Sequence, residues 1–238
     1  MIETFVSSHS TCTDKCQTVV CFLAGILTYR NNFEAAAYEV VQRYPDAKVV
    51  VIFPYGMASG TSRSAQRRLL TRQLPQVGYD LIHGPSRRVR LVSDIIYEHG
   101  ASADQILLIG HSAGGVVAYR TGLILEEKFG LKQVQVFAVG SPKFHLKDIP
   151  FNKRFTYISG RDPDKVTRIG SWRRPGSRVY SGQPGQDIRL DFNPGHSGWQ
   201  YHASYFLKSD WKDQNDVLHS NVGDLISKIH ELCPDLQR

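Results

Sequence analysis

The residues QILLIGHSAGGVV (105–117) join two sequence patterns that meet at Ser112. The run 105–110 is mostly apolar, which is typical of a strand buried on both faces of a parallel sheet. The residues after Ser112 fit an amphipathic helix. Gly110 and Gly114 stand two positions on either side of the serine, where larger side chains would collide with the neighbouring helix and strand. The stretch therefore predicts a strand, a sharp turn that projects a serine, and a helix.

The same alternation of buried-type strands and amphipathic helices runs through most of the chain. Strands are expected at 18–24, 47–53, 105–110, 133–140 and 154–159, with a shorter strand or hairpin within 177–192, and helices at 33–44, 62–74, 86–99, 113–130, 203–208 and 218–229. This order predicts an α/β fold, mainly a parallel sheet with helices on both faces. We expect one domain over 1–238, with a loosely ordered N-terminal segment at 1–16. Ligand sites in such sheets lie at the carboxyl ends of the strands.

Ser112 stands at such a carboxyl end, within the pattern G-x-S-x-G. In its strand–turn–helix context this pattern is typical of a nucleophilic serine. The N–H of Ala113 would lie at the helix N-terminus, where it can donate to a developing oxyanion with help from the helix dipole. The simpler interpretation makes Ser112 an ordinary N-cap, but the glycines on both sides favour catalysis. His111 is expected to be a packed turn residue.

On these residues the sequence resembles the α/β-hydrolase fold superfamily, the serine esterases and lipases, over about 17–232. The resemblance implies a single-domain fold of this type and a catalytic order of serine, acid and histidine along the chain. The run DKVTRI beginning at Asp164 resembles the segment around the acid of the class 3 lipases. Asp164 is therefore the first candidate for the acid, and Asp162 in the same loop is the alternative.

The histidine is sought after the acid, because a serine hydroxyl needs a base to become nucleophilic. The stretch YHASYFL (201–207) resembles the H-x-x-Y-hydrophobic ending of many α/β hydrolases, which implies that His202 is the base. His196, in PGHSGW, is the alternative. His219 and His230 are expected within the terminal helix, away from the chemistry.

The resemblance also implies a second oxyanion donor in the loop after the first strand, AGILTYRNN (24–32). Gly25 would let the backbone approach the substrate, and the N–H of Ile26 is the candidate donor beside that of Ala113. The family often has His-Gly here, whereas this chain has Ala24-Gly25.

The implied reaction is hydrolysis of a carboxylic ester, from a small-molecule or lipid substrate, through an acyl-enzyme on Ser112. It requires no metal and no organic cofactor. About 14 residues separate the fourth and fifth strands, which is too few for a helical cap, so little or no lid is expected. The alternatives are an acyltransferase or thioesterase with the same triad, or a non-catalytic binding member of the fold.

The chain of 238 residues has a formal net charge of +7, and its arginines are unevenly spread. Seven of them lie between Arg63 and Arg90, where Asp80 is the only acid. A solvated face is the default interpretation, and attraction to anionic surfaces is the functional one. Because no nucleic-acid motif accompanies the arginines, no nucleic-acid partner is expected.

The four cysteines are expected to be reduced thiols, with a Cys12–Cys16 disulfide as the alternative. Three residues separate Cys12 from Cys16, whereas zinc knuckles usually have two, so no metal site is expected. The apolar stretch 19–27 is too short to span a bilayer and lacks the flanks of a signal peptide. These features predict a cytoplasmic protein.

Overall fold

A computed structural model describes residues 2–7, 16–58, 62–83, 85–144, 154–161, 164–169, 187–192, 198–213 and 215–233. The main sheet has seven strands in the order β1-β3-β2-β4-β5-β6-β7, and only β1 is antiparallel to its neighbour. Its strands are β1 (Glu3–Val6), β2 (Thr18–Leu23), β3 (Ala47–Phe53), β4 (Gln105–His111), β5 (Val134–Val139), β6 (Phe155–Gly160) and β7 (Asp187–Leu190). The predicted mainly parallel sheet is confirmed, and the segment 1–16 contributes the edge strand β1.

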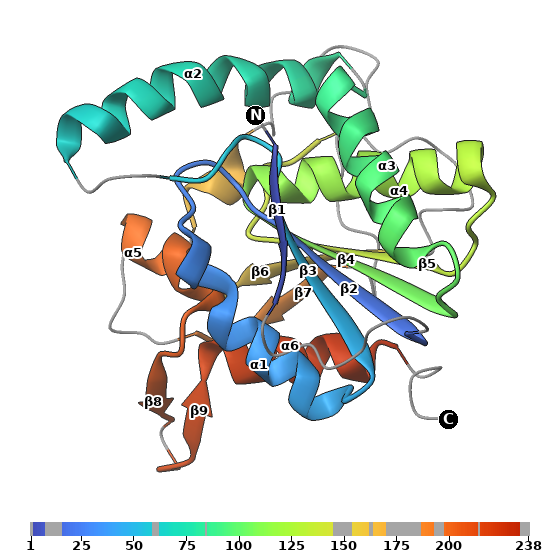
Figure 1. The fold of residues 1–238 in the computed structure, drawn as a ribbon. Coiled ribbons are helices and arrows are strands. Elements are labelled where there is room, and N and C mark those ends of the chain that lie inside the picture. Colours follow the sequence, from blue (N-terminus) through green and yellow to red (C-terminus); the bar gives the residue numbers. More distant parts are fainter. Residues whose placement is uncertain are drawn as a thin grey trace.

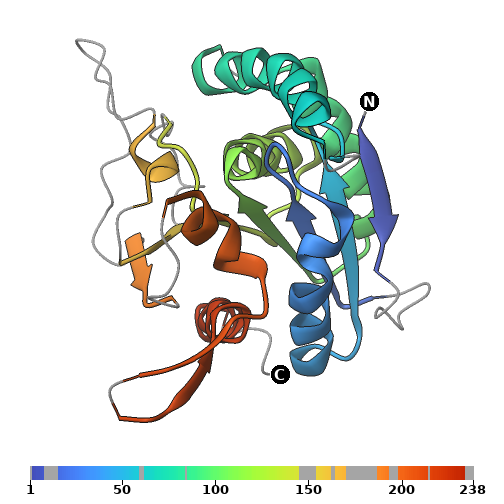
Figure 2. The ribbon, with the colours of Figure 1, turned by 90° about the vertical axis from the view of Figure 1, so that its left-hand side faces the viewer.

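Helices cover both faces of this sheet, as the sequence predicts (Figures 1 and 2). One face carries α2 (Arg63–Ile82), α3 (Arg87–Gly100) and α4 (Ala113–Phe129), and the other carries α1 (Glu34–Arg43) and α6 (Asn221–Glu231). Short helical turns lie at η1 (Arg30–Phe33), η3 (Val166–Arg168), α5 (Gly198–Ala203) and η4 (Ser204–Phe206). The two helical layers explain why the central strands are apolar throughout.

The sheet has a hydrophobic core on each face, and successive residues of a central strand point alternately into one core and the other. In the register of β2 with β4, Cys21 lies opposite Leu108 and Phe22 lies opposite Ile109. Cys21 and Leu108 pack under α3 and α4, while Phe22 and Ile109 pack with α1 and α6. All four side chains are almost completely buried. Burying a side chain of this size contributes about 1.5–3 kcal/mol, so the sheet is firmly held on both faces.

Helix α2 departs from its predicted end. The sequence predicts a helix that stops at Leu74, but α2 continues through Pro75 to Ile82. A proline cannot donate the hydrogen bond to the carbonyl four residues before it, and this normally ends a helix. Here the inner side of the helix is held by Gln73 and Asp80, which are buried and hydrogen-bonded to residues 55 and 56 after β3. Tertiary contacts therefore override the local signal.

The end of the chain also differs in detail from the expectation. The terminal helix begins at Asn221, and the residues just before it form β9 (Leu218–Ser220). This strand pairs with β8 (Asp210–Lys212) in a small hairpin, so His219 lies in a strand and not in a helix. None of the described helices is long and apolar enough to cross a membrane.

Among the described cysteines, Cys16 differs from the expected reduced state. Cys16 is disulfide-bonded, whereas Cys21 and Cys233 are free and buried. Cys12, named in the alternative, lies outside the described residues. Cys16 lies just before β2, and the thiol of Cys21 within β2 is reduced as expected.

Candidate active site

Ser112 occupies the predicted turn between β4 and α4. Its backbone has φ 55° and ψ −131°, a left-handed φ that is uncommon for a residue with a Cβ. Its side chain makes no capping hydrogen bond to α4, so it is not an ordinary N-cap. The turn also needs glycine, because a Cβ at Gly114 would lie 2.0 Å from the carbonyl oxygen of Leu23 in β2. The strained backbone therefore presents the hydroxyl at the carboxyl end of the sheet.

The loop after β2 lies directly beside this serine. A Cβ at Gly25 would lie only 2.7 Å from the Cβ of Ser112, so glycine is required for this approach. The next residue, Ile26, is the predicted oxyanion donor. Its N–H directly follows Gly25, where this loop contacts Ser112. Thr28 steadies the loop by donating its hydroxyl to the carbonyl of Gly25 (3.2 Å).

Gln73 of α2 holds the same loop from the other side, and no sequence signal identified it. Its Oε1 accepts from the N–H of Leu27 (3.1 Å), and its Nε2 donates to the carbonyls of Tyr55 (3.0 Å) and Gly56 (3.1 Å). Leu27 has φ 54°, another left-handed backbone conformation. Gln73 is 1% exposed, so its three hydrogen bonds are protected from water. The amide thereby fixes the conformation of the loop next to Ser112.

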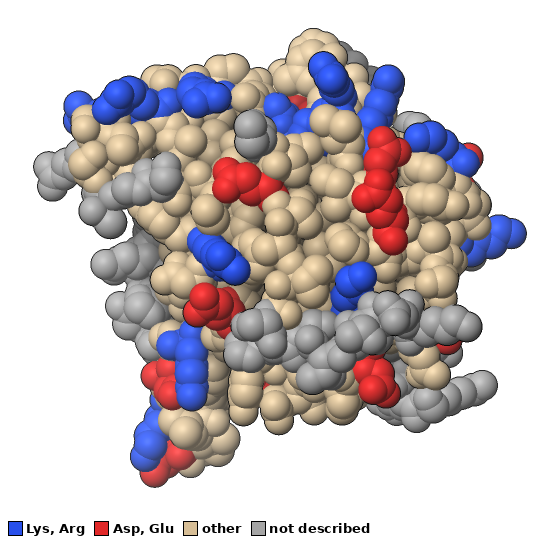
Figure 3. Space-filling model, in the orientation of Figure 1, with Lys and Arg blue, Asp and Glu red and all other residues tan. Residues whose placement is uncertain are grey.

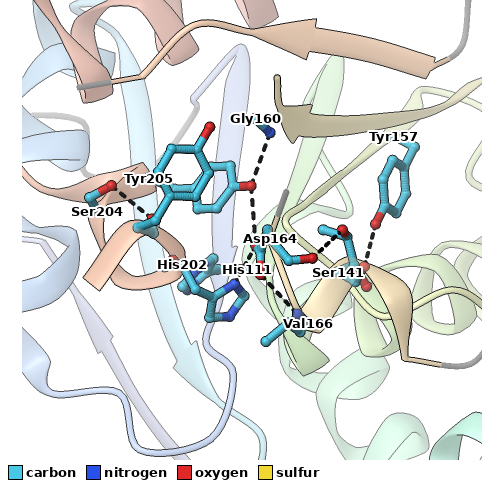
Figure 4. Close-up of polar contacts among 11 residues, drawn as sticks. His111, Ser141, Tyr157, Gly160, Asp164, Val166, His202, Ser204 and Tyr205 are labelled. Carbon is cyan, nitrogen blue, oxygen red and sulfur yellow. Dashed lines mark hydrogen bonds and ion pairs between the residues drawn. The ribbon is translucent and has the colours of Figure 1, made fainter. Parts of the chain in front are cut away.

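Asp164 and His202 form a buried pair (Figure 4). The Nδ1 of His202 donates to the Oδ2 of Asp164 at 2.6 Å. Asp164 is 2% exposed and His202 is 7% exposed. Because Nδ1 carries the proton that faces the carboxylate, the Nε2 of the neutral ring keeps its lone pair and can accept a proton. The structure thus brings together the two residues that the family resemblance selects as acid and base.

Two further groups hold the carboxylate of Asp164. Its Oδ1 accepts from the N–H of Val166 (2.8 Å), and its Oδ2 accepts from the hydroxyl of Tyr205 (3.2 Å). Tyr205 in turn accepts from the N–H of Gly160 at the end of β6 (3.0 Å). Burial, reinforced by the charge of Asp164, raises the pKa of Tyr205, so its hydroxyl remains a donor. The tyrosine of H-x-x-Y, Tyr205, is therefore part of the network that orients the carboxylate of Asp164.

His111 links the Ser112 turn to α5, the short helix that contains His202. Its Nε2 donates to the backbone carbonyl of His202 (3.0 Å), and the two rings stack with centroids 4.9 Å apart. Ser112 is the next residue in the chain after His111. Burial, followed by the neighbouring His202, lowers the pKa of His111 from its ordinary value of 6.5 to about 3. His111 is thus a neutral support for His202 and not only a packed turn residue.

The depressed pKa of His111 predicts a specific acid sensitivity. Between pH 6.5 and 3 the unfolded chain binds a proton at this residue that the folded chain excludes, so stability falls as the pH falls. His111→Gln should remove this contribution, which is at most about 1.4 kcal/mol per pH unit for one site. Urea unfolding followed by circular dichroism at pH 7, 5.5 and 4.5 measures it. An equal pH dependence of the free energy of unfolding in variant and wild type would contradict the prediction.

Some of the predicted features lie outside the described residues. These are the alternative acid Asp162, the alternative base His196, and most of the segment between β5 and β6 on which the expectation of little or no lid depends. Among the described residues, the contact between Asp164 and His202 and the approach of Gly25 to Ser112 define the candidate site.

Comparisons with known proteins identify the fold. No model of a known protein family matches the chain, and no curated protein sequence matches it. Among solved structures, the chain is similar to YbtT, a type II thioesterase from the yersiniabactin NRPS/PKS biosynthetic pathway. The TM-score is 0.55, with 12% identity over 99% of this chain and 99% of that chain. This likeness, together with the mainly parallel sheet, shows that the chain has an α/β-hydrolase fold.

Two further solved structures resemble parts of the chain. The RedJ thioesterase from the prodiginine pathway of Streptomyces coelicolor has a TM-score of 0.35 and 20% identity over 53% of this chain, which spans 40% of RedJ. An esterase of Pyrobaculum calidifontis has a TM-score of 0.33 and 15% identity over 59% of this chain and 45% of that chain. Both matches are partial, so the fold is assigned from the full-length likeness to YbtT.

Proposed function

We propose that this chain is a serine hydrolase that cleaves carboxylic esters through an acyl-enzyme on Ser112. The observation that carries the proposal is the 2.6 Å hydrogen bond between His202 Nδ1 and Asp164 Oδ2, together with the hydrogen bond by which His111, next to Ser112, holds the backbone of His202. A histidine that is oriented by a buried carboxylate and can reach a serine on a sharp turn is the arrangement that activates a hydroxyl for acyl transfer.

In the proposed reaction, His202 Nε2 takes the proton of the Ser112 hydroxyl while Oγ attacks the ester carbonyl carbon. The carbonyl oxygen gains negative charge, and the N–H groups of Ile26 and Ala113 donate to it. Asp164 stabilises the imidazolium that forms on His202 and keeps its Nδ1 directed away from the substrate. The proton then passes from Nε2 to the departing alkoxide, which leaves as an alcohol, and Ser112 remains acylated.

Deacylation repeats these steps with water in place of the serine hydroxyl. His202 Nε2 removes a proton from water, and the resulting hydroxide attacks the acyl carbonyl. The same two N–H groups hold the second oxyanion, and His202 returns the proton to Ser112 Oγ as the carboxylic acid departs. Removing a single oxyanion donor typically costs about 10²–10³ in kcat. The rigid support of the Gly25 loop by Gln73 and Thr28 is consistent with this need for fixed donors.

A second candidate function is thioester hydrolysis, which the full-length likeness to the thioesterase YbtT favours. It uses the same residues and differs in the leaving group, a thiolate. Transfer of the acyl group to an alcohol acceptor would also use them. A non-catalytic binding role requires that the Ser112 hydroxyl and His202 do not react, although the turn is formed.

A substrate panel separates these candidates. We expect the wild-type protein to hydrolyse 4-nitrophenyl acetate or butyrate, and Ser112→Ala to reduce this to the rate without enzyme. Acyl-coenzyme A thioesters of matched chain length, with thiol release as the readout, test the second candidate. Faster turnover of thioesters than of esters would replace the proposed reaction by thioester hydrolysis. Absence of turnover with both substrate classes, for a protein with an intact far-UV spectrum, would support the binding role.

A further inference from the structure

Helix α2 and the start of α3 carry a concentrated positive charge, which Figure 3 shows in blue along the upper edge of the molecule. We call this surface the basic face and define it by its exposed arginines, Arg67, Arg68, Arg72, Arg87 and Arg90. Between residues 62 and 93 the sequence has one acid, Asp80. Asp80 is fully buried and already paired with Arg88, whose Nη1 donates at 2.8 Å. Asp80 therefore neutralises the charge of the inward-facing Arg88 and leaves the charges of the basic face uncompensated by any acid of this segment.

Large apolar side chains are exposed on α2 and at the start of α3, and those of Tyr79 and Ile82 lie on the outward side of α2. The exposed fractions are 53% for Leu74, 51% for Tyr79 and 57% for Ile82, and Leu91 at the start of α3 is 44% exposed. At 100° per residue, Arg68, Arg72, Tyr79 and Ile82 fall on the side opposite the buried Gln73 and Val77. A surface helix ordinarily has polar residues on this side. The basic first half of α2 is instead followed by an apolar second half.

The helix is held so that these apolar residues cannot turn inward. Gln73 bonds to the loops after β2 and β3, and Asp80 accepts from the hydroxyl of Tyr55 (3.1 Å) and from Arg88. These contacts are buried and lie on the inner side of α2. The rotation of the helix about its axis is therefore fixed, and its outward side stays available to a partner.

We propose that the basic face and the apolar residues beside it dock on an anionic lipid bilayer. Arginines bind lipid phosphates with their planar donor groups. Tyr79 and Ile82 enter the boundary between headgroups and acyl chains, as the apolar residues of interfacial helices do. Cationic and aliphatic side chains on one surface favour this partner over nucleic acid, whose bases stack on aromatic rings. The inference is independent of the proposed hydrolysis, because docking requires no turnover.

Sedimentation with sucrose-loaded vesicles tests the docking. We expect the full chain to bind vesicles of phosphatidylcholine with 30% phosphatidylglycerol, and to bind pure phosphatidylcholine at least tenfold more weakly. Arg67→Glu, Arg68→Glu and Arg72→Glu combined should weaken binding to the anionic vesicles roughly 100-fold, since each arginine near such a surface contributes a few-fold. Tyr79→Ser and Ile82→Ser combined should weaken the vesicle binding that remains at 0.5 M salt, where the attraction between charges is screened.

A matched control carries the same change of charge on other parts of the molecule. Lys132→Glu, Arg189→Glu and Lys208→Glu are three exposed positions outside the basic face, and this variant should retain most of the binding. Thermal melting by circular dichroism verifies that each variant is folded. The inference is overturned if the wild type does not bind anionic vesicles, or if both charge variants lose binding equally. Binding to polyglutamate without binding to vesicles would also overturn it, in favour of an acidic protein partner.

Discussion

Ser112→Ala is expected to abolish labelling by a fluorophosphonate probe and to lower kcat/KM for ester hydrolysis by about 10⁴–10⁶. The probe forms a covalent bond only with an activated hydroxyl, so the variant lacks both the attacking atom and the proton donor to His202. Fluorescence of the labelled band after electrophoresis measures the first effect, and initial rates measure the second.

Ser141→Ala is the matched control for this variant. Ser141 is also a buried serine, and it follows β5, the neighbour of β4. Its hydroxyl donates to the carbonyl of Pro142, so it is engaged elsewhere. We expect this variant to label at the wild-type rate. Labelling that persists in Ser112→Ala would disprove the assignment of the nucleophile.

Asp164→Asn is expected to lower kcat/KM by roughly 10⁴ while leaving the protein folded. In the wild-type protein three donors, from His202, Val166 and Tyr205, converge on the two oxygens of the Asp164 carboxylate. The asparagine amide offers these donors only one oxygen. The neutral group also cannot stabilise the imidazolium on His202. Ester hydrolysis across pH 5–9 measures the loss, and circular dichroism verifies the fold.

Asp162→Asn is the control, because Asp162 is the alternative acid in the same loop. We expect it to keep most of the activity. If the two aspartate variants showed the reverse order, Asp162 would be the acid and the proposed role of Asp164 would be wrong. The same comparison applies to the base, where His202→Ala should prevent labelling and His196→Ala should not.

The strands and the serine turn were predictable because their signals are local. The apolar run 105–110 and the flanking glycines specify a buried strand and a sharp turn without reference to distant residues. The turn is present at Ser112 with the expected backbone strain. The continuation of α2 past Pro75 was not predictable, because it depends on contacts of Gln73 and Asp80 with residues 55 and 56, which are distant from them along the chain.

The residues of the candidate site could be selected from the sequence, whereas the contacts that support them could not. Asp164 and His202 were selected by their short flanking patterns, which carry information about the acid and the base. The hydrogen bond from Tyr205 to Asp164 spans 41 residues, and the contact of His111 with the carbonyl of His202 spans 91. No local pattern in the sequence indicates which buried polar groups form hydrogen bonds across such long sequence separations. These pairings arise when packing brings β4, β6 and η4 together.

The three hydrogen bonds of Gln73 have a mechanical consequence. A single amide clamps α2 to the turn after β3 and to Leu27, next to the proposed oxyanion donor. A displacement of α2 is therefore transmitted by these hydrogen bonds to the loop that borders Ser112. The outward side of α2 and the loop beside Ser112 are in this way mechanically coupled.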